Sequence, residues 1–238
     1  PEEQADPIGD DAHSPVEGLV HRYPDRVLLK LLHQCAVHCR FCFRREMIAE
    51  KRPPLSEEAL EKALSYIRAH QEIWEVILSG GEPLLLSDRR LDDVLTKLDA
   101  IPHVKIIRIH TRAPIAQPER ITEELIDLFK RRKPVYIVIH CNHAREIGEK
   151  ARGALTKLAE AGLPLLSQSV LLRGVNDSAE ALSDLFRTLT ENRVKPYYLH
   201  QLDRAPGTSH FRIPIEEGQK LVRSLRGQLS GLCLPSYM

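Results

Sequence analysis

Six short apolar segments alternate along this chain with six segments of helical pattern, and this order restricts the possible folds strongly. The predicted strands are 27–33, 74–79, 104–110, 135–140, 164–171 and 195–200. The predicted helices are 57–70, 88–100, 121–132, 145–162, 178–193 and 215–230. Strands that alternate with helices are typical of a parallel sheet, and short continuous apolar strands agree with this. Because the chain lacks the glycine fingerprint of a dinucleotide-binding fold, we predict an α/β fold with a partial (βα)6 barrel.

Polar or reactive residues follow almost every predicted strand. They are Cys35–Cys42, Ser79–Glu82, His110–Arg112, His140–His143, Gln168 and Asp203. In barrels of parallel strands the active site is built at the carboxyl ends of the strands. We therefore expect these residues to meet in one site.

Three of the five cysteines, Cys35, Cys39 and Cys42, fall within eight residues. This spacing favours a [4Fe–4S] cluster with one iron left open, since four cysteines close the usual electron-transfer cluster. A zinc site is the alternative, but structural zinc takes four protein ligands. Cys141 and Cys233 lie far away in sequence and are interpreted as core thiols. A local thiol cluster of odd number indicates a reducing, cytoplasmic compartment and not a disulfide framework.

The composition excludes several classes of protein. The 238 residues carry 34 basic and 33 acidic side chains, so no footprint for nucleic acid is expected. No apolar run approaches the roughly 18 residues of a membrane span, and the start of the chain is acidic and polar, unlike a signal peptide. We divide the chain into an irregular N-terminal arm over 1–20 and one barrel domain over 21–238. Because the chain begins with Pro1 and stops directly after a helical pattern, we expect the natural protein to extend beyond both ends.

The second strand is followed by the turn Ser79-Gly80-Gly81-Glu82-Pro83. Two glycines allow the backbone to approach a ligand closely and to offer its N–H groups. Alone this turn is a weak signal, but after a loop with three cysteines it becomes a strong one.

The cysteine loop and the glycine turn together resemble the radical S-adenosylmethionine (SAM) superfamily. Longer stretches are similar to its lysine 2,3-aminomutase family, in the same order along most of the chain. They are HRYPDRVLL (21–29), CAVHCRFCFRR (35–45), LSGGEPL (78–84), RIHTRAP (108–114), HCNHAREI (140–147), QSVLLRGVND (168–177), PYYLHQLDRAPGTSHFR (196–212) and LRGQLSG (225–231).

The resemblance implies a barrel of the radical SAM type and an isomerase with three cofactors. These are a [4Fe–4S] cluster, SAM and pyridoxal phosphate (PLP). Cleavage of SAM by one electron would give a 5′-deoxyadenosyl radical, which takes a hydrogen from the β-carbon of lysine. The α-amino nitrogen, held by PLP, would then move to that carbon. The resemblance further implies a reducing electron donor and a homo-oligomer.

It also implies roles for individual residues. Cys35, Cys39 and Cys42 would hold the cluster. Residues for SAM would be Ser79, Gly80, Gly81, Glu82, His140 and Gln168, and residues for PLP would be Arg22, Tyr23, Arg26 and Arg112. Arg44 would bind the substrate carboxylate, which suits a guanidinium, and Asp203 would pair with the distal ammonium.

The chain departs from the family pattern in places. The family's PLP lysine lies in a glycine-rich segment beyond the equivalent of Met238, so no Schiff-base lysine is assigned. Glu82 stands where aspartate is common. Phe41 and His200 resemble the branch that acts on a lysyl group destined for elongation factor P, whereas HRYPDR (21–26) resembles the free-lysine branch.

Three hypotheses about the function therefore stay open. The first is a 2,3-aminomutase acting on free lysine, on the elongation factor P lysine or on another amino acid. The second is a radical SAM enzyme that uses no PLP. The third is a non-catalytic iron–sulfur or zinc protein, which would need neither the glycine turn nor substrate-binding residues at the strand ends.

Overall fold

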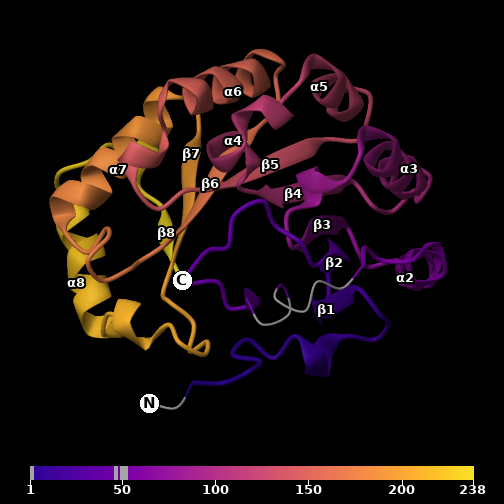
Figure 1. The fold of residues 1–238 in the computed structure, drawn as a ribbon, viewed down its shortest axis with the longest axis horizontal. Helices are drawn as coiled ribbons and strands as arrows, with labels where there is room; N and C mark the ends of the chain where they lie inside the picture. Colours follow the sequence, from indigo (N-terminus) through magenta and orange to yellow (C-terminus); the bar gives the residue numbers. More distant parts are fainter. Residues whose placement is uncertain (1–2, 46–47, 49–52) are drawn as a thin grey trace.

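The structure is a computed structural model, and it describes residues 3–45, 48 and 53–238. Eight strands form one sheet in sequence order (Figure 1). They are β1 Leu19–Tyr23, β2 Arg26–Leu32, β3 Glu75–Gly80, β4 Ile106–Thr111, β5 Val135–His140, β6 Leu165–Val170, β7 Lys195–His200 and β8 Ser236–Tyr237. β1 pairs with β2 antiparallel, and all later neighbours are parallel.

Helices follow the six parallel strands β2 to β7 and surround the sheet in an arc from α2 to α8 (Figure 1). They are α2 Glu57–Ala69, α3 Asp88–Asp99, α4 Ala113–Ala116, α5 Glu123–Lys130, α6 Glu149–Glu160, α7 Ala179–Glu191 and α8 Ile215–Leu225. Single turns of 3-10 helix are η1 Asp11–His13, η2 Pro83–Leu85, η3 Pro118–Arg120, η4 Ala144–Glu146, η5 Ser209–Phe211 and η6 Gly231–Cys233. The predicted partial (βα)6 barrel is confirmed.

The helix starts are set by hydroxyl side chains. Ser56, Ser87, Thr122 and Ser178 each accept a hydrogen bond from the backbone N–H three residues later, at the starts of α2, α3, α5 and α7. The predicted helix 145–162 is split instead. His143 and Glu146 form a capping box over the short turn η4, and α6 begins only after Gly148.

The two faces of each strand have different surroundings. On β4, Ile107 and Ile109 belong to the buried apolar core that packs between the sheet and the helices. The alternate residues Arg108 and His110 lie on the opposite face, inside the barrel. The face of the sheet inside the barrel is therefore more polar than the continuous apolar segments of the sequence predicted.

The sequence pattern did not indicate β1 or β8, which close the two edges of the sheet. The segment before β8 is held by a lysine: Lys195 Nζ donates to the carbonyl oxygens of Gly231, Leu232 and Leu234, at 2.9 to 3.2 Å. The chain then pairs with β7, where Met238 N donates to Leu199 O at 2.9 Å. Such edge strands depend on partners that are distant in sequence.

The N-terminal arm runs across the carboxyl ends of the strands. Glu3 accepts hydrogen bonds from the backbone N–H groups of Gly207 and Ser209, and Gln4 N donates to Arg204 O. The arm predicted over 1–20 begins with two residues outside the described part, and its last two already belong to β1. No helix in the described part of the chain combines the length and the apolar character that crossing a membrane requires.

We expect Gly81→Ala to destabilise the protein by about 1–3 kcal/mol, because the added carbon would meet the backbone O and N of Gln34, and backbone atoms cannot move aside easily. Gly153→Ala is the matched control. Gly153 lies inside α6 with nothing within 4 Å of an added carbon, so alanine should stabilise by about 0.5–1 kcal/mol. Urea unfolding of the protein without cofactors measures both changes. Equal stability of Gly81→Ala and the parent protein would contradict this packing.

Candidate active site

The cysteine loop follows β2 and lies against the glycine turn of β3. Cys35, Cys39 and Cys42 are free, half-buried thiols. All three line one cavity of about 120 Å³, together with the turn Ser79–Glu82 and with strand-end residues that include His140 and Gln168. The structure thus gathers the three predicted cluster ligands and all six residues predicted for SAM.

The glycine turn is hydrogen-bonded to the backbone that leads into the cysteine loop. Gly81 N donates to Leu32 O at 2.7 Å, and Glu82 N donates to Gln34 O at 2.8 Å. Gly80 has a φ of +103°, which side chains disfavour, and a Cβ there would meet Leu32 O. Both glycines are therefore needed for the turn to approach the loop.

The burial of the thiols suits the binding of a metal cluster better than contact with water. Burial raises the pKa of Cys35 to about 12, with smaller contributions from Glu82 and the other two thiols, and burial also raises the pKa of Cys42. Iron would replace these protons, since cysteine binds metal as thiolate. Among the described residues, no three His, Cys, Asp or Glu side chains are gathered to share a single ion. Each cysteine of a four-iron cluster binds a different iron, so a cluster does not require such a gathering.

Glu82 has its carboxylate engaged within the protein. Oε1 accepts from the Thr111 hydroxyl at 2.7 Å and from Leu84 N at 3.1 Å, and Oε2 accepts from Arg112 N at 2.7 Å. Burial raises the pKa of Glu82, while these hydrogen bonds act to lower it. The side chain therefore joins the glycine turn to the end of β4, and contacts with a ligand are left to the backbone of the turn.

A second cavity of about 330 Å³, here called the inner chamber, lies within the barrel beside Cys39 and Cys42. Its polar lining consists of Arg44, Ser79, His110, His140, Gln168, His200 and Asp203. Its apolar lining includes Leu28 of β2, Phe43 of the cysteine loop and Ile8 of the N-terminal arm. The predicted substrate residues Arg44 and Asp203 are thus brought together beside two of the three cysteines.

Arg44 has unused hydrogen-bonding capacity. Its NH2 group forms an ion pair of 2.8 Å with Asp10 of the arm, and its guanidinium lies 4.3 Å from the ring centre of Phe43. Its Nε is buried without a hydrogen-bond partner among the described residues. Asp203 has a raised pKa because of burial, which the charge of Arg44 partly offsets. A cation and a carboxylate in one chamber suit a ligand that carries both charges.

Two neutral histidines line the same chamber. Burial lowers the pKa of His140 to about 3, helped by the charges of Arg112 and His200, and burial also places the pKa of His110 well below its usual value. Each has a buried Nε2 without a partner in the described part of the chain. Because buried polar atoms in proteins are nearly always paired, these nitrogens are suited to a polar ligand.

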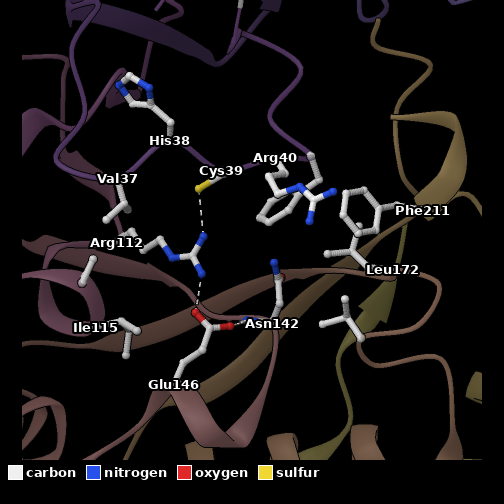
Figure 2. A pocket seen from close by; sticks show the side chains of 13 residues that line it. Val37, His38, Cys39, Arg40, Arg112, Ile115, Asn142, Glu146, Leu172 and Phe211 are labelled. Atoms are coloured by element: carbon white, nitrogen blue, oxygen red, sulfur yellow. Dashed lines mark hydrogen bonds and ion pairs between the residues drawn. The ribbon is translucent and has the colours of Figure 1, made fainter. Parts of the chain in front are cut away.

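Arg112 lies apart from the other residues assigned to PLP. It reaches toward Cys39 and Glu146 on the outer side of the cysteine loop (Figure 2). Arg22 and Tyr23 lie on β1 and Arg26 begins β2, with the Arg26 guanidinium 3.9 Å from the ring centre of Tyr23. None of the cavities described above contains all four residues, and the role of Arg112 at PLP stays a prediction. Arg112 follows β4 on the cysteine side, whereas the others lie at the edge of the sheet.

Some residues of the site were noted in the sequence without a binding role. His110 of the predicted group His110–Arg112 is the last residue but one of β4, His200 is the last residue of β7, and both line the inner chamber. Phe41 stacks on His140 with ring centres 5.4 Å apart. Asp10 and Glu146 gave no local signal, because their partners Arg44 and Arg112 are 34 residues away in each case.

We expect His140 to make stability depend on pH in the acid range. Burial lowers its pKa from the ordinary value of 6.5 to about 3 in the folded protein, so between these values the unfolded chain binds more protons. The free energy of unfolding should therefore fall as the pH is lowered from 6.5 toward 3, by at most about 4 kcal/mol from this group. Urea unfolding across this range, compared with His140→Gln, measures the contribution. Identical slopes for the two proteins would contradict it.

Comparison with proteins of known sequence identifies relatives for most of the chain. The model of the radical SAM superfamily matches residues 29–186. The chain is 45% identical over 233 residues to the L-lysine 2,3-aminomutase of Clostridium subterminale, covering 98% of this chain and 56% of that protein. It is 45% identical over 232 residues to the L-lysine 2,3-aminomutase of Escherichia coli K12, covering 97% and 67%. The chain thus spans about half the length of the Clostridium relative.

Solved structures support the same fold. Streptococcus suis SuiB bound to its precursor peptide SuiA aligns with a TM-score of 0.66 at 14% identity, over 92% of this chain and 50% of that one. A radical SAM methyltransferase from Sphaerobacter thermophilus aligns with a TM-score of 0.65 at 19% identity, over 92% and 68%. The superfamily model and the sequence relatives show that the chain belongs to the radical SAM superfamily and, within it, to the L-lysine 2,3-aminomutase family, whose members are isomerases.

Proposed function

We propose that this chain forms the radical SAM barrel of a PLP-dependent 2,3-aminomutase that moves the α-amino group of lysine to the β-carbon. The observation that carries this proposal is the inner chamber. It places a guanidinium with a free Nε, Arg44, and a buried carboxylate, Asp203, in one cavity beside two cluster cysteines. A scaffold or electron carrier has no need of such a chamber.

Membership of the superfamily implies a [4Fe–4S] cluster and SAM, and the three thiols around one cavity fit that cluster. When bound, the cluster and SAM supply the carbon-centred radical that abstracts a hydrogen atom from the substrate. Cys35, Cys39 and Cys42 hold the cluster. The backbone of the turn Ser79–Glu82, together with His140 and Gln168, binds SAM.

The chamber's charges orient a lysine by its two ends. Arg44 holds the carboxylate, and Asp203 holds the distal ammonium, whose positive charge restores a low pKa to the buried carboxyl. His110 and His140 stay neutral and add no positive charge that would compete for the carboxylate. Ile8 of the arm and Leu28 exclude water from the radical chemistry.

PLP is assigned to the hairpin of β1 and β2. Arg22 and Arg26 offer two guanidinium groups for its phosphate, and the Tyr23 ring, half exposed at the surface, offers a phenol. Both arginines stand within five residues around the β1–β2 turn, and the Arg26 guanidinium also forms an ion pair of 2.7 Å with Asp25. No lysine of this sequence is assigned to the Schiff base.

A second substrate is favoured by two chamber residues. Phe41 and His200, which distinguish the branch acting on the elongation factor P lysine, both line the inner chamber. A protein-bound lysyl group would use the same pair of charges. The two candidates are therefore separated by assay and not by the geometry of the chamber.

The test uses the full-length protein, prepared without oxygen, with cluster, reductant, SAM, PLP and L-lysine. Mass spectrometry of derivatised products should reveal 3,6-diaminohexanoate. Asp203→Asn should lose this product, whereas Asp177→Asn, outside the chamber, should keep it. SAM cleavage without product from lysine would move the substrate to lysylated elongation factor P or to another amino acid. An intact cluster without SAM cleavage would contradict the proposal.

A further inference from the structure

Cys39 borders the inner chamber on one side and a second pocket on the other. A pocket of about 540 Å³ opens there, lined by Cys39, Arg112, Asn142, Glu146 and apolar side chains such as Leu172. Figure 2 shows the Arg112 side chain lying between the cysteine and the glutamate. Its NH1 donates a hydrogen bond of 2.8 Å to Cys39 Sγ, and its NH2 forms an ion pair with Glu146.

Both the backbone and the guanidinium of Arg112 are fixed by hydrogen bonds or ion pairs. Arg112 N donates to Glu82 Oε2 at 2.7 Å, which fixes the backbone. Glu146 is itself fixed, because its Oε1 accepts from the backbone N–H groups of Asn142 at 2.8 Å and His143 at 3.0 Å. The donor that faces Cys39 is therefore pre-organised on two strand ends, β4 and β5.

The charge of this donor is permanent. A guanidinium stays protonated in proteins, so Arg112 carries its positive charge beside Cys39. The Arg112 and Glu146 side chains are only 21% and 22% exposed, so solvent weakens their field little. Cys35, by contrast, lines the small cavity together with Glu82.

We propose that Arg112, positioned by Glu146, raises the reduction potential of the cluster by donating a hydrogen bond and a positive charge to the Cys39 sulfur. One-electron reduction by an external low-potential reductant adds one negative charge to the cluster and its thiolates. A cationic donor at a ligand sulfur stabilises that charge. Glu146 acts in the opposite direction, since its carboxylate compensates part of the cation. The inference depends on the cluster of the proposed function but not on its substrate.

The test is a redox titration of the full-length protein with reconstituted cluster, without SAM, PLP or substrate, followed by electron paramagnetic resonance. Arg112→Met should shift the equilibrium toward the oxidised cluster at least tenfold, which is about 59 mV for one electron. Glu146→Gln should shift the midpoint toward positive values, because the cation loses its counter-charge while the amide oxygen can still accept from the loop. Arg132→Gln is the matched control, since Arg132 is a similarly buried arginine paired with Asp92 and Asp99, and its midpoint should not move.

The opposite signs of the two shifts separate this role from a structural one. If Arg112→Met assembles no cluster, the midpoint potentials of Arg112→Lys and Glu146→Gln test the proposal instead. The midpoint of Glu146→Gln must still be higher than that of the parent protein. The midpoint of Arg112→Lys must be equal to or lower than that of the parent protein. Midpoints of both within the scatter of Arg132→Gln would overturn the proposal. Weaker SAM binding with an unchanged midpoint would also overturn it and would assign Arg112 to SAM. Failure to form the lysine product would leave these titrations unaffected.

Discussion

Cys39→Ala is expected to abolish cluster binding and, with it, all cleavage of SAM. Cys39 is one of the three thiols around the small cavity, and it also borders the inner chamber and the outer pocket. Two remaining thiolates cannot replace the third, because a cluster held by two cysteines exposes a second iron to solvent. Iron and sulfide content after anaerobic reconstitution, and SAM cleavage by chromatography, measure the effect.

Cys141→Ala and Cys233→Ala are the matched controls for that experiment. The Cys141 thiol is fully buried and donates to His143 O at 3.4 Å, and Cys233 is buried in η6. Loss of either sulfur should lower stability by about 1 kcal/mol and leave the iron content unchanged. A cluster that survives in Cys39→Ala but not in Cys141→Ala would refute the assignment of the ligands.

Arg44→Gln is expected to lower kcat/KM for L-lysine by about 30-fold to several thousand-fold. This range corresponds to about 2–5 kcal/mol for removing one partner of a buried, hydrogen-bonded charge pair. The variant leaves the substrate carboxylate without its cation and leaves the buried Asp10 without its ion pair to Arg44. Steady-state formation of 3,6-diaminohexanoate, normalised to cluster content, measures the loss.

Arg45→Gln provides the control, since the neighbouring guanidinium lies outside the chamber and reaches the carbonyl oxygens of Arg40 and Gly207. It should change kcat/KM less than about threefold. L-lysine amide sharpens the comparison, because a substrate without a carboxylate should be affected far less by Arg44→Gln than lysine is. Equal losses for lysine and its amide would show that Arg44 does not bind the carboxylate.

The parallel barrel follows from local pattern alone. The predicted strands 135–140 and 195–200 coincide with β5 and β7, and the other four differ by a few residues at their ends. The periodic spacing of apolar residues and the hydroxyl caps act within a single helix or strand. They can therefore be recognised in the sequence without knowing which elements pack beside it. Because polar residues gather at the carboxyl ends of the strands in such barrels, one shared site was predicted. The structure places Cys35, Ser79, His140 and Gln168 around one cavity.

Other features were decided by contacts between distant segments. β8 is two residues long and exists through its pairing with β7 and the carbonyl contacts of Lys195. The motif around Arg112 does not indicate where its side chain points, and in the structure the guanidinium contacts Cys39 and Glu146. A sequence motif specifies which residue stands at a strand end. The direction of a long, charged side chain depends on which partner the fold brings within its reach, and that partner lies 34 residues further along the chain.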